Sequence, residues 1–150
     1  MSIVEEIIFL GTGTSSCIPT VPCLTAPNPV CKPCLSTLTP KGAKNIRKNT
    51  SLLVRVRKDD TEGRLRNILI DSGKTFYESA LRLFPRYRIR EIDALVLTHG
   101  HADAMYGLDD LRAWTQKDSI QEYISIYLDQ ETMRSIEITF PYLVDSSKAT

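Results

Sequence analysis

The segment LVLTHGHADAMYGLDDLR, residues 95–112, passes from an apolar run directly into a cluster of histidines and aspartates. The run IDALVLT, residues 92–98, is typical of a strand that is buried on both faces of a sheet. Leu108, Leu111 and Trp114 follow at helical spacing, so we expect a helix after the polar cluster. This order of buried strand, polar cluster and helix indicates an α/β fold.

Further strands and helices alternate along the chain. Apolar or alternating segments predict strands over residues 4–10, 50–56, 67–73 and 122–128. The polar segment KDDTEGR, residues 58–64, predicts a hairpin turn between the second and third of these elements. A final helix is predicted over residues 130–140. Together the elements predict an α/β chain with a mixed sheet.

The segment KTFYESALRLFPRY, residues 74–87, predicts an amphipathic helix. Its apolar face should consist of Phe76, Ala80, Leu83 and Phe84. A proline lacks the backbone N–H that a helix interior needs, so Pro85 is expected to terminate the helix.

Composition excludes several classes of protein. The 150 residues carry a net charge of +1, and no basic run is long enough to predict a dominant nucleic-acid or membrane surface. The start MSIVEEIIFLGTG has two glutamates where a secretory leader needs a basic start and an apolar stretch. We therefore expect a soluble, cytoplasmic protein with no membrane partner. In such a reducing compartment, cysteines are thiols or metal ligands more often than disulfides.

Residues 11–48 form a long irregular segment that needs something other than a core to hold it. Within it, PCLTAPNPVCKPCL contains Cys23, Cys31 and Cys34, and the last two have the spacing of a zinc-binding pair. The proline-stiffened loop favours a structural zinc site, although a set of free thiols is the alternative. No fourth ligand is obvious, since Cys17 lies beside the glycine turn.

His99, His101 and Asp103 follow the buried strand with a two-residue period. If this period continues the strand, the three side chains project to the same side and converge on one point. Imidazole and carboxylate suit zinc, manganese or iron, which would turn a bound water into a nucleophile. The alternative is that the histidines simply close a strand and Asp103 caps the next helix.

At these residues the sequence resembles the metallo-β-lactamase fold, whose metal motif is usually Thr-His-x-His-x-Asp-His. FLGTGTSSCIP is similar to the opening strand and glycine turn of that fold, and ILIDSG to a later strand. The three cysteines resemble the zinc loop of a branch that includes the phosphonate-pathway cyclic phosphodiesterase. More distantly, the chain is similar to transfer-RNA 3′-end-processing nucleases. The resemblance implies the N-terminal portion of a four-layered αββα sandwich over residues 1–150, with a zinc loop at about 17–48.

The resemblance also implies roles for individual residues. His99 and His101 would bind a first metal, and Asp103 would bind a second metal or orient the attacking water. Asp71 would also be a catalytic residue, as a hydrogen-bond acceptor that lies behind these ligands. One departure is Ala104, which stands where the family usually has the last histidine and so removes a ligand of the second metal.

The leading functional prediction is a metal-dependent hydrolase, in particular a phosphodiesterase that uses a metal-bound hydroxide on a small anionic substrate. A non-catalytic zinc-binding module or degenerate hydrolase is the alternative, and a thioesterase or RNA-processing nuclease is a further one. The cations of residues 41–49 either steer an anionic substrate or form a solvated basic loop.

In the resembled family, the remaining metal ligands come from the second half of the fold. We therefore expect an incomplete metal site and an uncovered apolar sheet face in residues 1–150. Such a face would be covered by self-association or by a C-terminal half.

Overall fold

The computed structural model describes residues 2–58, 63–117 and 119–148. Its strands are β1 (Ser2–Gly11), β2 (Ser51–Lys58), β3 (Leu65–Ile70), β4 (Ala94–Val96) and β5 (Ser125–Tyr127). Its helices are α1 (Val21–Leu24), α2 (Lys32–Ser36), α3 (Phe76–Tyr87), α4 (Ala102–Met105), α5 (Leu108–Thr115), α6 (Gln130–Thr139) and α7 (Pro141–Val144), with 3-10 turns η1 (Pro40–Asn45) and η2 (Ser146–Lys148). Most of the hairpin turn predicted over 58–64 lies outside the described residues.

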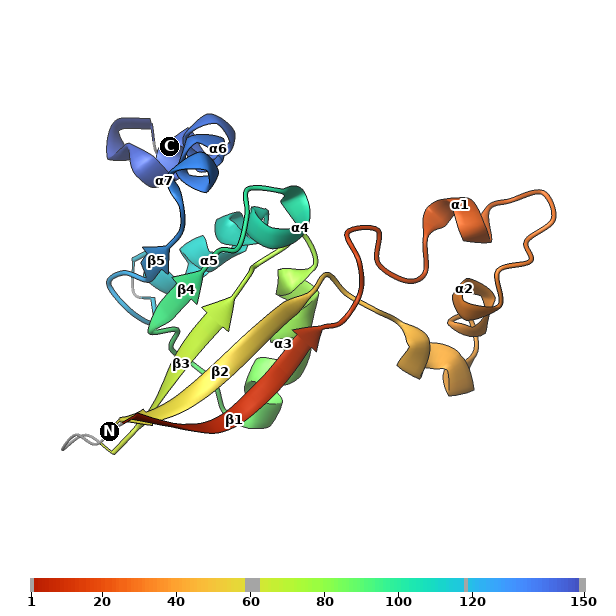
Figure 1. Cartoon of the computed structure of the whole chain (residues 1–150), viewed down its shortest axis with the longest axis horizontal. Helices are drawn as coiled ribbons and strands as arrows, with labels where there is room; N and C mark the ends of the chain where they lie inside the picture. The colour runs from red at the N-terminus through yellow and green to blue at the C-terminus, as the bar shows by residue number, and fades with distance from the viewer. Residues whose placement is uncertain (1, 59–62, 118, 149–150) are drawn as a thin grey trace.

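The strands form one mixed sheet in the order β1-β2-β3-β4-β5, as Figure 1 shows. β1, β2 and β3 pair antiparallel, whereas β3, β4 and β5 pair parallel. The prediction of an α/β chain with a mixed sheet is therefore confirmed. The register places one row of apolar residues side by side across the sheet, namely Ile8, Leu53, Leu69, Leu95 and Ile126.

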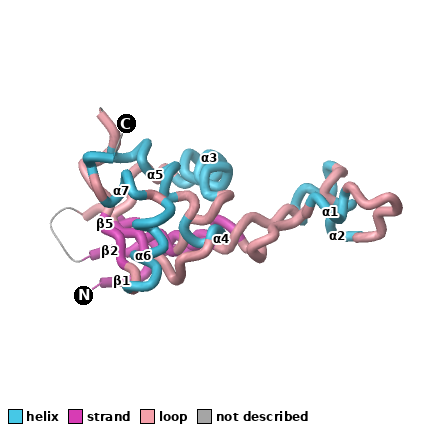
Figure 2. The backbone as a smooth tube through the Cα atoms, turned by 90° about the horizontal axis from the view of Figure 1, so that it is seen from above, coloured by secondary structure: helices cyan, strands magenta, loops and turns pink. Residues whose placement is uncertain are grey.

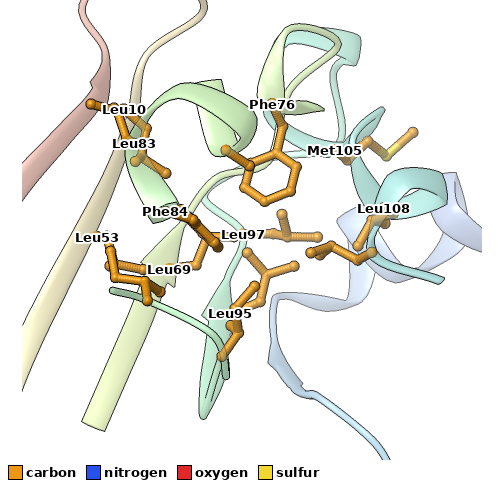
Figure 3. Close-up of a cluster of buried hydrophobic side chains, with 14 of the residues drawn as sticks. Leu10, Leu53, Leu69, Phe76, Leu83, Phe84, Leu95, Leu97, Met105 and Leu108 are labelled. Carbon is orange, nitrogen blue, oxygen red and sulfur yellow. The ribbon is translucent and has the colours of Figure 1, made fainter. Parts of the chain in front are cut away.

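Helices α3 and α5 cover the face of the sheet that carries this row (Figure 2). The predicted apolar face of α3 is confirmed, because Phe76, Ala80, Leu83 and Phe84 are all buried against the sheet. Trp114 of α5 meets Phe84 edge to face, with the ring centroids 5.9 Å apart. Each fully buried leucine or phenylalanine contributes about 1.5–3 kcal/mol of transfer free energy, so this layer holds the fold together (Figure 3).

The expectation that Pro85 ends α3 is wrong, because the helix continues to Tyr87. A proline removes only its own hydrogen bond to the carbonyl four residues earlier, and here that carbonyl belongs to Leu81 on the exposed side of the helix. Its C-cap is Arg88, which adopts a left-handed conformation with φ 53°. The N–H of Ile89 then donates to the carbonyl of Phe84 at 2.9 Å, which gives one carbonyl of the last helical turn a hydrogen-bond partner.

Two of the strands are shorter than predicted at the end that carries the polar residues. β3 ends at Ile70 because Asp71 has a φ of 57° and leaves the extended conformation. β4 ends at Val96, three residues before His99, so the histidines lie in the loop that follows the strand. The predicted helix over 130–140 is confirmed as α6, whereas α7, which begins at Pro141, was not predicted.

The outward face of the sheet is apolar and carries side chains that water reaches. On the edge strand β1, Ile7 is 54% exposed and Phe9 is 62% exposed. Their neighbours Val54 and Ile68 on the next strands are half-buried. In Figure 1 this face points toward the viewer, and α3 lies behind the sheet.

Residues 12–50 leave the sheet after β1 and return to it at β2, and we call them the arm. Figures 1 and 2 show the arm as a projection that holds α1, α2 and η1. Asn49 fastens its base: this buried side chain donates to the carbonyls of Thr14 and Ser15 at 3.1 and 3.2 Å. Thr75, at the start of α3, donates from its hydroxyl to Oδ1 of Asn49 at 3.2 Å.

No helix among the described residues is long and apolar enough to span a membrane.

Candidate metal centre

His99, His101 and Asp103 lie together at the carboxyl end of β4, beside the short helix α4. Each offers a ligand atom, and these atoms all lie within 4.8 Å of one another. Nε2 of His99 is 3.7 Å from Oδ1 of Asp103, and the two imidazole rings are nearly perpendicular with centroids 4.9 Å apart. The structure therefore brings together the three side chains that the sequence singled out.

The backbone route to this arrangement differs from the prediction. The histidines do not continue a strand, because β4 ends at Val96 and His101 is the N-cap of α4. Gly100 lies between them and packs against α6, where a Cβ atom would come within 2.7 Å of the Ser135 hydroxyl. A loop with this close contact turns both imidazoles toward Asp103.

Thr98 links the buried Asp71 to His99. The backbone N–H of Thr98 donates to Oδ1 of Asp71, and its hydroxyl donates to Oδ2, both at 2.8 Å. The same hydroxyl lies 2.9 Å from Nδ1 of His99. A hydroxyl has one hydrogen, which is used toward Asp71, so the Thr98 oxygen accepts from the Nδ1–H of His99. In the neutral imidazole, this hydrogen bond selects the tautomer whose Nε2 carries the free lone pair, which is the form that binds a metal.

Asp71 thus acts on the histidine through Thr98, while the sequence prediction gave Thr98 no role. The threonine of the Thr-His-x-His-x-Asp motif was visible in the sequence and would have indicated this contact. The left-handed backbone at Asp71 turns β3 into the following segment, and its carbonyl accepts from the Ser51 hydroxyl at 2.8 Å.

The turn after β3 also holds α4 in place. The N–H of Ser72 donates to the carbonyl of Ala104 at 2.7 Å, and that of Lys74 donates to Ala102 at 3.1 Å. Gly73 passes so close that a Cβ atom would lie 1.9 Å from the carbonyl of Asp103. Any larger residue at Gly73 would therefore displace the backbone that carries the Asp103 carboxylate.

Ala104, Asp110 and Asp129 lie near this segment in sequence but contribute nothing to the three-residue cluster. Ala104 is 1% exposed and its methyl group offers no donor atom, so no ligand replaces the histidine expected at this position. Asp129 caps α6, where its Oδ1 accepts from the N–H of Thr132 at 2.8 Å. Burial, reinforced by the neighbouring Asp109, raises the pKa of the Asp110 carboxyl, which lines a cavity between α3 and α5.

Cys23, Cys31 and Cys34 form the second cluster, within the arm. Their sulfur atoms lie within 4.8 Å of one another, and Cys34 is buried. Zn–S bonds of about 2.3 Å in a tetrahedron place sulfurs roughly 3.8 Å apart, so this spacing is compatible with zinc. Hydrogen bonds from the Thr20 side chain, and then from the Cys34 and Cys31 thiols, lower the pKa of Cys23.

Both clusters fit a metal ion. Each supplies three donors from short neighbouring segments, and the histidine that Thr98 orients presents the nitrogen a metal needs. These are the two such groups of three or more ligand residues found in the described part of the chain. Cys17 belongs to neither group, and all four cysteines are free thiols.

Comparison with known proteins gives the family. Residues 66–150 match the Beta-lactamase superfamily domain. The chain is 33% identical over 138 residues to an octanoyltransferase of Porphyromonas gingivalis, which covers 91% of this chain but 23% of that protein. The chain thus spans only a small part of the length of that relative.

Two solved structures share the fold. A diphosphatase from the PhnP family superposes with a TM-score of 0.71 at 31% identity, over 95% of this chain and 48% of the other. Zn(2+)-bound PqqB from Methylobacterium extorquens superposes with a TM-score of 0.63 at 20% identity, over 99% of this chain and 43% of the other. The chain spans about half the length of these proteins. The family match, which covers more than half of the chain, and the shared mixed sheet show that this chain belongs to the beta-lactamase superfamily.

Proposed function

We propose that the chain forms the first half of a metal-dependent hydrolase that cleaves phosphodiester bonds. The observation that carries the proposal is the convergence of His99, His101 and Asp103, whose ligand atoms lie within 4.8 Å of one another. The 31% identity to a PhnP-family diphosphatase supports chemistry at a phosphate group. A small anionic phosphodiester is the substrate class we favour.

The side chains divide the work of such a site. A zinc, manganese or iron ion at this cluster would supply a Lewis acid and lower the pKa of a water bound to it. His99 and His101 each present a ring nitrogen toward the site, and Asp103 presents a carboxylate that can orient a water and accept its proton. Asp71 and Thr98 are positioning residues in this proposal, because their hydrogen bonds act on the His99 ring.

The cysteine cluster has a structural role in this proposal. Zinc bound by Cys23, Cys31 and Cys34 would tie the two sides of the arm together, since α1 buries no residue and α2 buries only Cys34. The free thiols also support our proposal of a cytoplasmic location, where reducing conditions keep cysteines unpaired.

A non-catalytic zinc-binding module is the alternative that one observation favours. Ala104 offers no ligand where the family motif has a histidine, so a second metal would lack a donor from this segment. A thioesterase or an RNA-processing nuclease would use the same three ligands with a different substrate.

Metal analysis of single variants tests the proposal. We expect two metal pools, one lost in His99→Ala and His101→Ala, and one lost in Cys31→Ser. A screen of cyclic and linear phosphodiesters should detect turnover in a protein extended to the length of its relatives. Asp103→Asn should lower kcat by about 100-fold or more, the usual scale for a group that handles a proton. Asp109→Asn is the matched control, because Asp109 is an exposed aspartate that pairs with Arg112 on α5.

Loss of all metal in Cys31→Ser, with none lost in the histidine variants, would favour the non-catalytic alternative. Turnover that is equal in Asp103→Asn and Asp109→Asn would reject the proposed catalytic site even if metal is bound.

A further inference from the structure

Every charged side chain of the arm is basic. Residues 12–50 contain five lysines and arginines and no aspartate or glutamate, whereas the whole chain has 19 basic and 18 acidic residues. The remaining residues therefore contain 14 basic and 18 acidic side chains, and the basic excess of the protein lies in the arm. A concentrated positive field of this kind attracts anions and raises their local concentration.

Four cations surround one small cavity where the arm meets the sheet. The cavity has a volume of about 180 Å³ and lies beside the last residues of β1. Lys44, Arg47 and Lys48 line it from the arm, and Arg82 lines it from the neighbouring helix α3. The lining contains no acidic residue. A ligand in this cavity would therefore meet positive charge from two separate elements of the fold.

Two of these cations are held in place. Nη1 of Arg47 donates to the carbonyl of Lys44 at 2.6 Å and to that of Ile46 at 3.2 Å. The ammonium group of Lys48 forms an ion pair with Glu78 of α3. Within the part of the chain that the structure describes, no ion pair engages Lys44, Arg47 or Arg82. Their charge is available to an anionic ligand.

The cavity is separate from the metal cluster but lies at the same end of the sheet. β1 ends beside the cavity at Gly11, and β4 ends just before His99. The strand order puts β1 three strands away from β4. At roughly 4.8 Å per strand, this separation is about 14 Å. One ligand could reach both places only if it is larger than a single phosphodiester.

We propose that Lys44, Arg47, Lys48 and Arg82 form a subsite for a second phosphate group of the substrate. The inference rests on the proposed function for its link to catalysis, although binding at the subsite can be measured without turnover. Guanidinium and ammonium groups are the side chains that bind phosphate oxygens most strongly. The phosphate belongs either to a small bisphosphate or to a short oligonucleotide, and both sources share this chemistry.

Binding of two probes separates these sources. Adenosine 3′,5′-bisphosphate is titrated by calorimetry, and a fluorescein-labelled single-stranded pentanucleotide is titrated by anisotropy, both at low salt. Lys44→Gln combined with Arg82→Gln should weaken binding about tenfold or more. Lys117→Gln combined with Arg134→Gln is the matched control, because it also removes one lysine and one arginine, both exposed and neither lining the cavity. His99→Ala combined with His101→Ala should retain the binding.

A loss confined to one probe in the Lys44/Arg82 variant supports the subsite and identifies its source. Equal affinity of that variant and the Lys117/Arg134 control, for both probes, overturns the subsite. Loss of all binding in the His99/His101 variant also overturns it, because the phosphate would then lie at the metal cluster. Hydrolysis that is independent of the histidines would instead reject the proposed function and leave the binding result intact.

Discussion

The hydroxyl of Thr98 donates a 2.8 Å hydrogen bond to Oδ2 of the buried Asp71. This contact uses the one hydroxyl hydrogen of Thr98, so its oxygen can accept from Nδ1 of His99, 2.9 Å away. A carboxylate buried behind the site thereby sets the tautomer of a histidine that it does not touch. Hydrogen-bond partners of this kind fix the tautomer and ring orientation of a metal-binding histidine.

Replacing Thr98 tests this relay. Thr98→Val keeps the shape of the side chain but removes the acceptor, so the metal affinity of the His99 cluster should fall about 10- to 100-fold. Thr98→Ser should restore it, since serine supplies the same hydroxyl. Competition with a chromophoric chelator measures the affinity, and Thr115→Val, on the exposed side of α5, is the control. Equal metal affinity in the two valine variants would contradict the relay.

The base of the arm depends on Asn49, which is 2% exposed and serves the carbonyls of Thr14 and Ser15. Asn49→Ala would remove the two side-chain hydrogen bonds to these carbonyls and the acceptor of the Thr75 hydroxyl hydrogen, while the backbone N–H of residue 49 could still donate to the Thr75 oxygen. A hydrogen bond contributes about 0.5–1.5 kcal/mol net, so losing these three bonds should lower the free energy of unfolding by about 2 kcal/mol. Urea titration measures it. Asn28→Ala, at an exposed position of the arm, should change stability by less than about 0.5 kcal/mol. Similar losses in both variants would refute the role of Asn49.

Most of the fold could be predicted because period and apolarity report local burial. The alternation in Ile8–Leu10 and the helical spacing of Phe76, Ala80 and Leu83 each describe a face that packs on the sheet. The residues at which helices and strands end were less predictable. The left-handed backbone at Asp71, which ends β3, is decided by long-range bonds from Ser51 and Thr98.

The convergence of His99, His101 and Asp103 was predicted, although by an incorrect backbone route. Their residue types and spacing could be recognised in the sequence, whereas their convergence depends on Gly100 packing against Ser135, some 35 residues later in the chain. No local pattern contains a contact of this kind. The basic cavity also escaped prediction, because Arg82 joins the arm cations only through the packing of α3 beside β1.

Stability should depend on pH through Asp110. Burial, with a contribution from Asp109, raises the pKa of its carboxyl, so the folded state binds the proton more tightly than the unfolded state. Stability from this group is therefore present below the unfolded pKa of about 3.9 and is lost as the pH rises through the folded pKa. Asp110→Asn should stabilise the protein at neutral pH by about 0.5 kcal/mol, a value reduced for solvent screening. Thermal unfolding at pH 7 and pH 3.5 checks this, and a stabilisation that is larger at the lower pH would contradict it.

Zinc removal should loosen the arm while the sheet stays folded. The arm buries few side chains, and Cys34 is the buried member of its metal cluster, so a bound ion would supply much of its local folding free energy. Chelation or Cys31→Ser should speed limited proteolysis between residues 23 and 34 by about tenfold or more, as expected when an ion worth a few kcal/mol is lost. Cys17→Ser is the matched control, because Cys17 lies outside the cluster. Unchanged protection after complete zinc removal would count against a structural zinc.

The apolar outward face of the sheet should govern the association state. Phe9 is 62% exposed there, next to Ile7, and such a surface gains free energy when another apolar surface covers it. We propose that a second copy covers this face when residues 1–150 are alone, and that C-terminal residues cover it in a protein of the length of its relatives. Light scattering should find a dimer or larger species that Phe9→Lys shifts toward monomer, with an association constant about tenfold lower or more.

Leu81→Lys is the matched control for that shift, because Leu81 is 60% exposed on α3, on the opposite side of the sheet. The C-terminally extended protein should be monomeric, hold more metal per chain and turn over phosphodiesters faster than the 150-residue chain. A monomeric 150-residue chain with full metal content and equal turnover would overturn this proposal. An equal shift from Leu81→Lys would place the interface on the helical side instead.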